Sequence, residues 1–151
     1  METWVSVQDA EIDTSALERR VAGASNKVGA VVSFSGLVRD FNDDGDILGL
    51  ELEHYPGMTE SSLEKIVAQA ADRWPLIAAS VAHRVGKIWN GEVIVHVSVA
   101  SRHRGQAFEA CQFIMDYLKT DAPFWKKELT RSGGHWVEAK ISDADARERW
   151  K

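Results

Sequence analysis

Hydrophobic residues recur along this chain at two spacings, and each spacing predicts a different kind of element. Residues 28–35 form a β-branched run that predicts a strand. In residues 47–54, apolar side chains occupy every second position, so Leu48, Leu50 and Leu52 are expected on one buried face of a strand. By the same reasoning, further strands are predicted at residues 79–89, 92–100 and 135–141.

Two longer segments place their apolar residues at helical spacing instead. Residues 59–74 are predicted to form an amphipathic helix, with Thr59 as its N-cap and Pro75 closing it. Residues 106–119 are predicted to form a second one, with Lys119 in its last turn.

Pro123 interrupts the second helical pattern, because a proline removes a helical N–H and its ring clashes with the preceding turn. Lys126, Lys127 and Glu128 are therefore expected on a new element, a short helix with Pro123 near its first position. Such a break lets Lys119 and Lys126 converge on one place. The alternative is that lysines near a helix C-terminus only suit the helix dipole and the solvent.

The order of these elements predicts the α+β class. Strands follow one another without regular helical crossovers, and Asn90-Gly91 is a strong signal for a hairpin turn. We therefore expect a largely antiparallel sheet with flanking helices. The chain of 151 residues has no repeat or linker, so residues 1–151 are expected to form a single domain. Ser142, with Asp145 three residues later, is expected to cap a last helix.

Composition narrows the classes of protein to consider. A net charge of -5 disfavours a nucleic-acid-binding domain, so any cationic site must be local. No apolar run approaches the roughly 20 residues that cross a bilayer, and residues 1–14 do not resemble a secretory signal. We therefore expect a cytoplasmic protein that does not bind membranes. The single cysteine, Cys111, lies in the second helical pattern and is expected to be a buried hydrophobic residue.

Positive charge gathers at three places, each following a predicted element. These are Arg39 after the first strand, the run Arg102-His103-Arg104, and Lys119 with Lys126 and Lys127. Cations that meet in one pocket repel each other, so such a cluster indicates a bound anion or paired acids. Phosphate suits both arginine and lysine. A lysine crowded by other cations can also act as an acid, a base or a nucleophile.

Other kinds of chemistry receive less support from the sequence. No histidine pair has metal-ligand spacing, and no glycine-rich phosphate loop is present, so neither a metal site nor a nucleotide core is expected. His83 and His96 lie within strand patterns and are interpreted as structural. Phe124 and Trp125 could form the wall of a site for a flat heterocycle, with ordinary packing as the alternative.

Four segments carry a resemblance to a known family. They read GAVVSFSGLVRD, LELEHYPGMTE, SRHRGQAFEACQFIMDYLKTDAPFWKKE and HWVEAK. Over about residues 29–140 the chain resembles the large, catalytic subunit of molybdopterin synthase. The resemblance implies an α/β hammerhead-type α+β domain that dimerises through its sheet. It also implies a heterotetramer, in which two small ubiquitin-like sulfur-carrier subunits bind at the far ends.

The resemblance further implies a sulfurtransferase reaction. Cyclic pyranopterin monophosphate becomes molybdopterin when two sulfurs are added as a dithiolene. Each sulfur comes from the C-terminal thiocarboxylate of a carrier, whose Gly-Gly tail enters the large subunit's pocket. No resident cofactor is therefore expected in this chain.

Site residues follow from the matching motifs. Lys119 and Lys126 would be catalytic, and Arg39, His103 and Arg104 would hold the phosphate. The whole substrate site would comprise Leu37, Val38, Arg39, His103, Arg104, Lys119, Lys126, Lys127 and Glu128. Lys140 stands where many relatives carry an arginine, and residues 1–28 carry no family signal.

One alternative belongs to a different functional class. A non-catalytic module that binds a phosphorylated small ligand, or an acidic tail of a partner, would need the cations but no reactive lysine. Turnover with a thiocarboxylated carrier distinguishes the two hypotheses.

Overall fold

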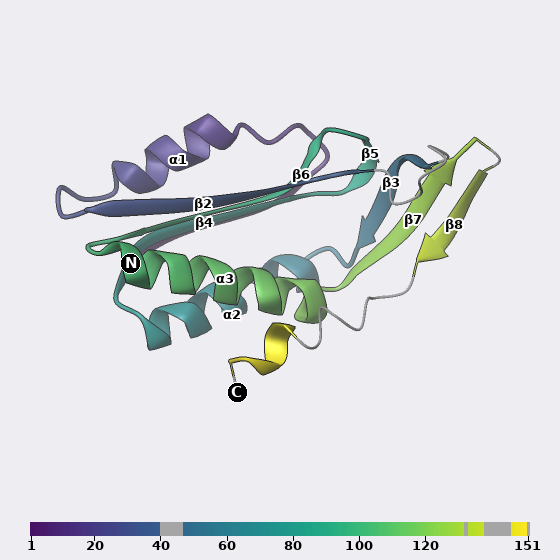
Figure 1. Ribbon diagram of the computed structural model, residues 1–151. Coiled ribbons are helices and arrows are strands. Elements are labelled where there is room, and N and C mark those ends of the chain that lie inside the picture. Colours follow the sequence, from purple (N-terminus) through teal and green to yellow (C-terminus); the bar gives the residue numbers. More distant parts are fainter. Residues whose placement is uncertain (40–46, 132, 138–145, 151) are drawn as a thin grey trace.

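The computed structural model describes residues 1–39, 47–131, 133–137 and 146–150 (Figure 1). The strands are β1 (Glu2–Gln8), β2 (Ala30–Leu37), β3 (Ile47–His54), β4 (Leu76–Arg84), β5 (Gly86–Trp89), β6 (Val93–Ser101), β7 (Phe124–Thr130) and β8 (Gly133–Val137). The helices with full bounds are α1 (Thr14–Ala22), α2 (Met58–Arg73) and α3 (Arg104–Asp121). Residues 146–148 form one more helical turn.

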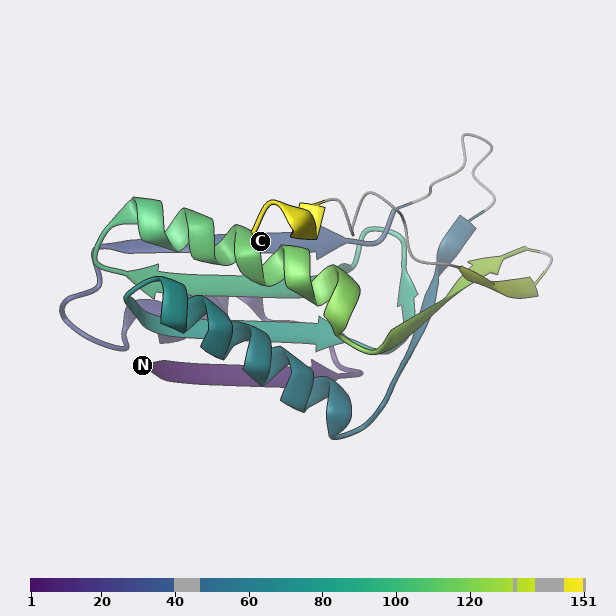
Figure 2. The same cartoon turned by 90° about the horizontal axis from the view of Figure 1, so that it is seen from below.

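In the described part of the chain, the strands form two four-stranded sheets. Sheet A has the order β1-β4-β6-β2, and sheet B has the order β5-β3-β7-β8. Only β1 and β4 pair in parallel, while the other pairs are antiparallel. Figure 2 shows α2 and α3 lying side by side across one face of sheet A, and Figure 1 shows α1 on the opposite face. The α+β class and the largely antiparallel pairing are thus confirmed.

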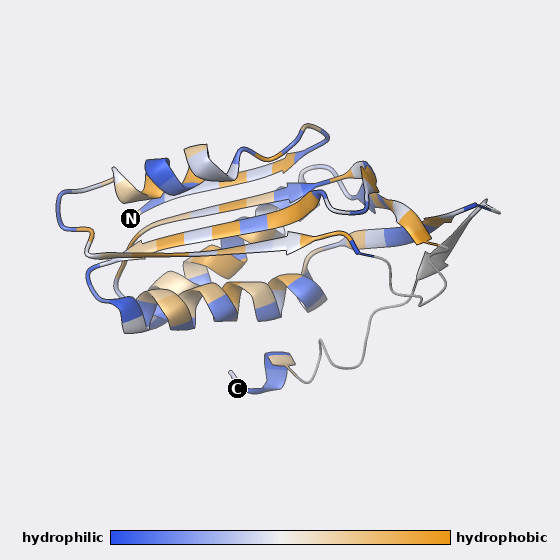
Figure 3. Cartoon of the chain, turned by 45° about the horizontal axis from the view of Figure 1, so that its top comes forward, coloured by the Kyte–Doolittle hydropathy of each residue, from blue (hydrophilic) through white to orange (hydrophobic). Residues whose placement is uncertain are grey.

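The core lies between sheet A and the two helices on its lower face. Val95, Val97 and Val99 of β6 project into it, as their alternate spacing predicts. They meet the apolar stripes of α2 and α3, including Leu63 and Ile114. The alternation of hydrophobic and hydrophilic residues along these strands is visible in Figure 3. None of the helices in the described ranges is long and apolar enough to cross a membrane.

Two predicted strands differ in detail from those in the structure. The bounds of β3 match the prediction, but Leu48 is 38% exposed because the pairing with β7 shifts register between Ile47 and Gly49. The predicted strand at 79–89 is two strands, since Gly86 adopts a positive φ of 79° between β4 and β5. β5 then pairs with β3, so the Asn90-Gly91 turn connects sheet B to sheet A and does not close a hairpin.

The prediction of a short helix after Pro123 is wrong. The segment forms strand β7, which pairs with β3 on one side and β8 on the other. Its sequence alternates, so Phe124, Lys126 and Glu128 share one face while Trp125 and Lys127 share the other. Backbone pairing on both sides outweighs the local helix preference of lysine and glutamate.

The helix ends also differ from the prediction. Gly57 is the N-cap of α2, with a φ of 84°, and Thr59 lies inside the first turn. Phe108 falls at an apolar position of the helical pattern but is 60% exposed, and Ala107 and Ala110 are buried instead. The sequence did not predict β1 or α1 at all. Ser142 and Asp145, the predicted last cap, lie outside the described residues.

Candidate functional site

The end of α3 and the start of β7 form the framework of the lysine site. Lys119 lies in the last turn of α3, Ala122 is its C-cap, and β7 begins at Phe124 (Figure 1). Lys126 follows on the same face of β7 as Phe124. Only Ala122 and Pro123 lie between the end of α3 and the start of β7. Both lysines therefore lie at the same end of sheet A.

A buried histidine lies between these elements. His83, near the end of β4, is 5% exposed, and its ring stacks on Phe124 with 3.9 Å between ring centroids. Burial is the main cause that lowers the pKa of His83 to about 4, and the charges of Lys119 and Lys126 contribute to the same shift. Both lysines therefore act on one imidazole, which supports the predicted convergence.

Thr59 stabilises the turn at Pro123 between α3 and β7. Its hydroxyl lies 3.0 Å from the Tyr55 carbonyl and 3.3 Å from the Pro123 carbonyl, and it accepts a hydrogen bond from the Tyr55 N–H. The side chain is fully buried. It connects the first turn of α2 to Pro123, which precedes β7. The start of β7 is therefore fixed by α2 as well as by the end of α3.

The register of β7 places its predicted site residues on two different faces of sheet B. Lys126 pairs with Leu52 and Glu128 with Leu50, and both leucines are buried on the inner face of sheet B. Lys127 pairs with Glu51 and projects to the outer face. Lys126 and Glu128 thus share a side of the strand that Lys127 does not.

The predicted phosphate residues occupy two different ends of sheet A. Val38 is buried and fixed by backbone hydrogen bonds to Glu92 and Gly91, so Arg39 emerges exposed beside the turn that precedes β6. His103 and Arg104 are exposed at the start of α3, where the β6 strand has already ended. The Ser101 hydroxyl donates to the His103 carbonyl at 2.6 Å and shapes that turn.

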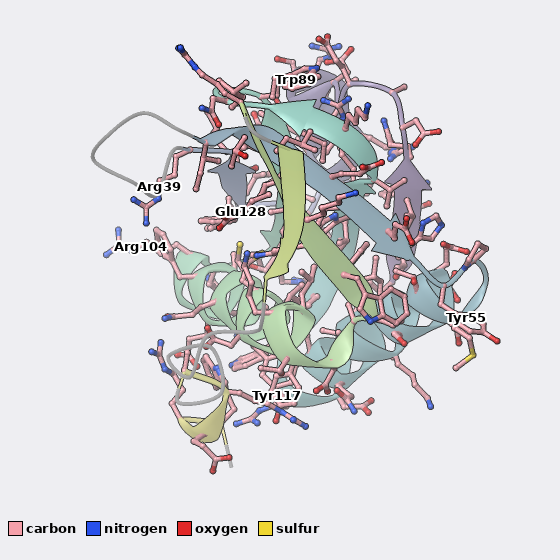
Figure 4. All side chains as sticks on the ribbon, turned by 90° about the vertical axis from the view of Figure 1, so that its right-hand side faces the viewer. Arg39, Tyr55, Trp89, Arg104, Tyr117 and Glu128 are labelled. Atoms are coloured by element: carbon pink, nitrogen blue, oxygen red, sulfur yellow. The ribbon has the colours of Figure 1, made fainter. Side chains whose placement is uncertain are left out.

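One chain does not bring all of these residues together. Lys119 lies fifteen positions after Arg104 on α3, which at 1.5 Å per residue is about 22 Å along the helix axis. Arg39 and Arg104 project close together in Figure 4, which looks along the length of the molecule, but Figure 1 places their elements at opposite ends of sheet A. Both arginines lie on the same side of the molecule in Figure 4.

Strand β2 is an edge of sheet A and connects these two ends. Val31, Phe34 and Leu37 are 36%, 42% and 55% exposed, although β4 and β6, the inner strands of this sheet, bury most of their apolar residues. An edge of eight residues with exposed apolar side chains is a surface onto which another strand can pair.

Sequence reasoning missed the role of His83 and Thr59. The alternation of Val81, His83 and Val85 does predict that His83 points inward. Nothing local predicts that it meets Phe124. Cys111 agrees with its prediction, because burial raises the pKa of its thiol to about 12 and leaves it unreactive at neutral pH.

The low pKa of His83 predicts a specific acid sensitivity. The native ring stays neutral down to pH about 4, whereas the ring in the unfolded chain takes up a proton below its ordinary pKa of 6.5. The stabilisation is therefore complete above pH 6.5 and is lost as pH falls towards 4, by about 3 kcal/mol. Urea unfolding from pH 7 to 4 should show this loss in the wild type and a smaller one in His83→Phe. Equal pH dependence in both proteins would contradict it.

Comparison with known proteins gives one consistent result. The family model described as MoaE protein matches residues 7–121. The molybdopterin synthase catalytic subunit of Pseudomonas aeruginosa is 51% identical over 97% of this chain and 98% of its own length. That of Ralstonia nicotianae is 53% identical over 97% of this chain and 83% of its own length.

Solved structures agree with the sequence comparisons. The molybdopterin biosynthesis MoaE protein from Burkholderia ambifaria has a TM-score of 0.85 and 46% identity, and the match covers 99% of this chain and 98% of that one. Molybdopterin synthase from Staphylococcus aureus has a TM-score of 0.81 and 30% identity, and the match covers 88% and 96%.

Proposed function

Because this chain belongs to the MoaE family of molybdopterin synthase catalytic subunits, we propose that it transfers sulfur to cyclic pyranopterin monophosphate to form the dithiolene of molybdopterin. The observation that carries the proposal is that Lys119, in the last turn of α3, lies next to the start of β7, where Lys126 follows Phe124, the residue that stacks on His83. The sulfur donor is the C-terminal thiocarboxylate of a small ubiquitin-like carrier subunit, so the chain needs no resident cofactor. The reaction takes place in the cytoplasm.

Two lysines at one place suit an anionic donor. A thiocarboxylate carries a negative charge, and two nearby ammonium groups attract it and hold it in position. Lys119, in the last turn of α3, is placed to protonate or polarise a group that gains negative charge as the carrier's sulfur bonds to the pterin. Lys126 completes the cationic pair from β7. A carrier tail that ends in two glycines fits between closely spaced walls.

A second copy of the chain completes the site. When β2 pairs antiparallel with β2 of a second copy about a twofold axis, Ala30 of one strand lies opposite Leu37 of the other. Ala30 is also the cross-strand partner of Ser101, which immediately precedes the basic run at residues 102–104. The pairing therefore carries His103 and Arg104 of one copy to the Arg39 end of the other, where that copy's lysines lie.

This arrangement assigns roles to the remaining residues. Arg39 of one copy, with His103 and Arg104 of the second, holds the cyclic phosphate through charge-assisted hydrogen bonds. Leu37 and Val38 line the substrate site beside Arg39, and Glu128 lines it beside Lys126. Lys127 projects from the other face of β7 and reaches the substrate only from the rim of the site. The homodimer binds one carrier per copy, which gives a heterotetramer.

Product formation tests the proposal. The purified chain, a thiocarboxylated carrier and cyclic pyranopterin monophosphate should together yield the dithiolene product, detected after oxidation to a fluorescent pterin. A carrier that lacks its last two glycines should give no product, because its anion cannot reach the lysines. Binding of the pterin without any turnover would instead favour the non-catalytic module.

A further inference from the structure

One nitrogen of the His83 imidazole is hydrogen-bonded to the backbone. Nδ1 lies 2.8 Å from the carbonyl oxygen of Arg84, and a carbonyl oxygen can only accept a hydrogen bond. Nδ1 therefore carries the hydrogen. In the neutral ring the lone pair is then on Nε2, which can only accept.

Nε2 is open to solvent although the residue is almost entirely buried. In the described part of the chain, the side chain of His83 makes a single hydrogen bond, the one through Nδ1. The inaccessible side-chain atoms of that part that have no hydrogen-bond partner are Gln106 Oε1 and Arg147 Nε. Nε2 is not among them, so it must belong to the 5% of the residue that solvent reaches.

The ring is held rigidly among positive charges. Its face stacks on Phe124 with 21° between the ring planes, and the next residue on the same face of β7 is Lys126. The charged or titratable groups that act on it are Lys119 from α3, Lys126 from β7 and His54 from β3, and Lys119 acts most strongly. A neutral acceptor with a fixed tautomer thus lies beside the two lysines of the proposed reaction.

We propose that His83 is a positioning residue of the lysine pair: its Nε2 accepts a hydrogen bond from the ammonium group of Lys119 and holds that group in place during sulfur transfer. This inference rests on the proposed function. Stacking on Phe124 and the bond to Arg84 fix the ring, so the acceptor does not have to be ordered when the substrate binds.

Three substitutions of His83 distinguish the roles of the two ring nitrogens. His83→Gln places an amide oxygen near the position of Nε2, His83→Asn places an amide N–H near the position of Nδ1, and His83→Phe keeps only the stacking. We expect His83→Gln to retain a kcat close to that of the wild type. His83→Asn and His83→Phe should lose roughly 10- to 150-fold in kcat, as expected for a hydrogen bond to a charged group, with the KM values for carrier and pterin unchanged.

A double-mutant cycle with Lys119→Ala makes the test specific. If His83 acts through Lys119, adding His83→Phe to Lys119→Ala should cause no further loss of activity. Full activity of His83→Asn together with loss in His83→Gln would show that the backbone bond matters, and would overturn the proposal. So would a further loss in the double variant, or wild-type kcat in all three single variants. Failure of the wild type to make product would instead contradict the proposed function.

Discussion

Replacing Lys119 by alanine is expected to reduce dithiolene formation by about 10²- to 10⁴-fold, the usual contribution of a positioned acid or base. The side chain is exposed at the end of α3, so its loss should change the free energy of unfolding by less than about 0.5 kcal/mol. The measurement compares product formation and thermal unfolding for the same preparation. Lys126→Ala should behave similarly.

Lys65→Ala provides a matched control. Lys65 is an exposed lysine on α2, so its substitution removes the same charge without touching the site. If Lys119→Ala turned over as fast as this control, Lys119 would have no chemical role. Loss of activity together with a large drop in melting temperature would show that the variant had only lost its fold.

The second large effect is expected at the phosphate residues. Arg104→Ala should weaken binding of the phosphorylated pterin by roughly 10- to 150-fold, because it removes a charged hydrogen-bond partner. Binding of the dephosphorylated pterin should not change. Arg102→Ala is the control, since it removes an adjacent exposed arginine that the site does not use. Isothermal titration with both pterins gives the comparison, and equal losses for the two ligands would contradict a phosphate role for Arg104.

Local patterns predicted much of the scaffold correctly. The bounds of β3 followed from alternation alone, and so did the valine face of β6 that packs against α2 and α3. The strand β7 could not be predicted in this way. Its lysines and glutamate favour a helix locally, and the pairing with β3 that decides the matter comes from a segment seventy residues earlier.

The sequence named candidate site residues but could not predict how they come together. The motif residues named Lys119, Lys126 and Arg104, while only the stacking of His83 on Phe124 shows what lies beside the lysines. The separation of Arg104 from Lys119 was already implicit in the predicted helix, because a helix of that length holds its two ends far apart. What the sequence could not supply was the open edge of β2, onto which the proposed dimer places a second copy.

In the proposed dimer, each site takes Lys119, Lys126 and Arg39 from one copy, and His103 and Arg104 from the other. Mixing Lys119→Ala and Arg104→Ala proteins tests this arrangement most directly, after brief unfolding and refolding to exchange subunits. The assay uses a pterin concentration too low for Arg104→Ala alone to turn over. In a mixed dimer, one site carries both defects and the other carries none. Random exchange should therefore restore about a quarter of wild-type product formation. If the mixture stays as inactive as its two components although mixed dimers are present, the site lies within a single chain and the account is wrong.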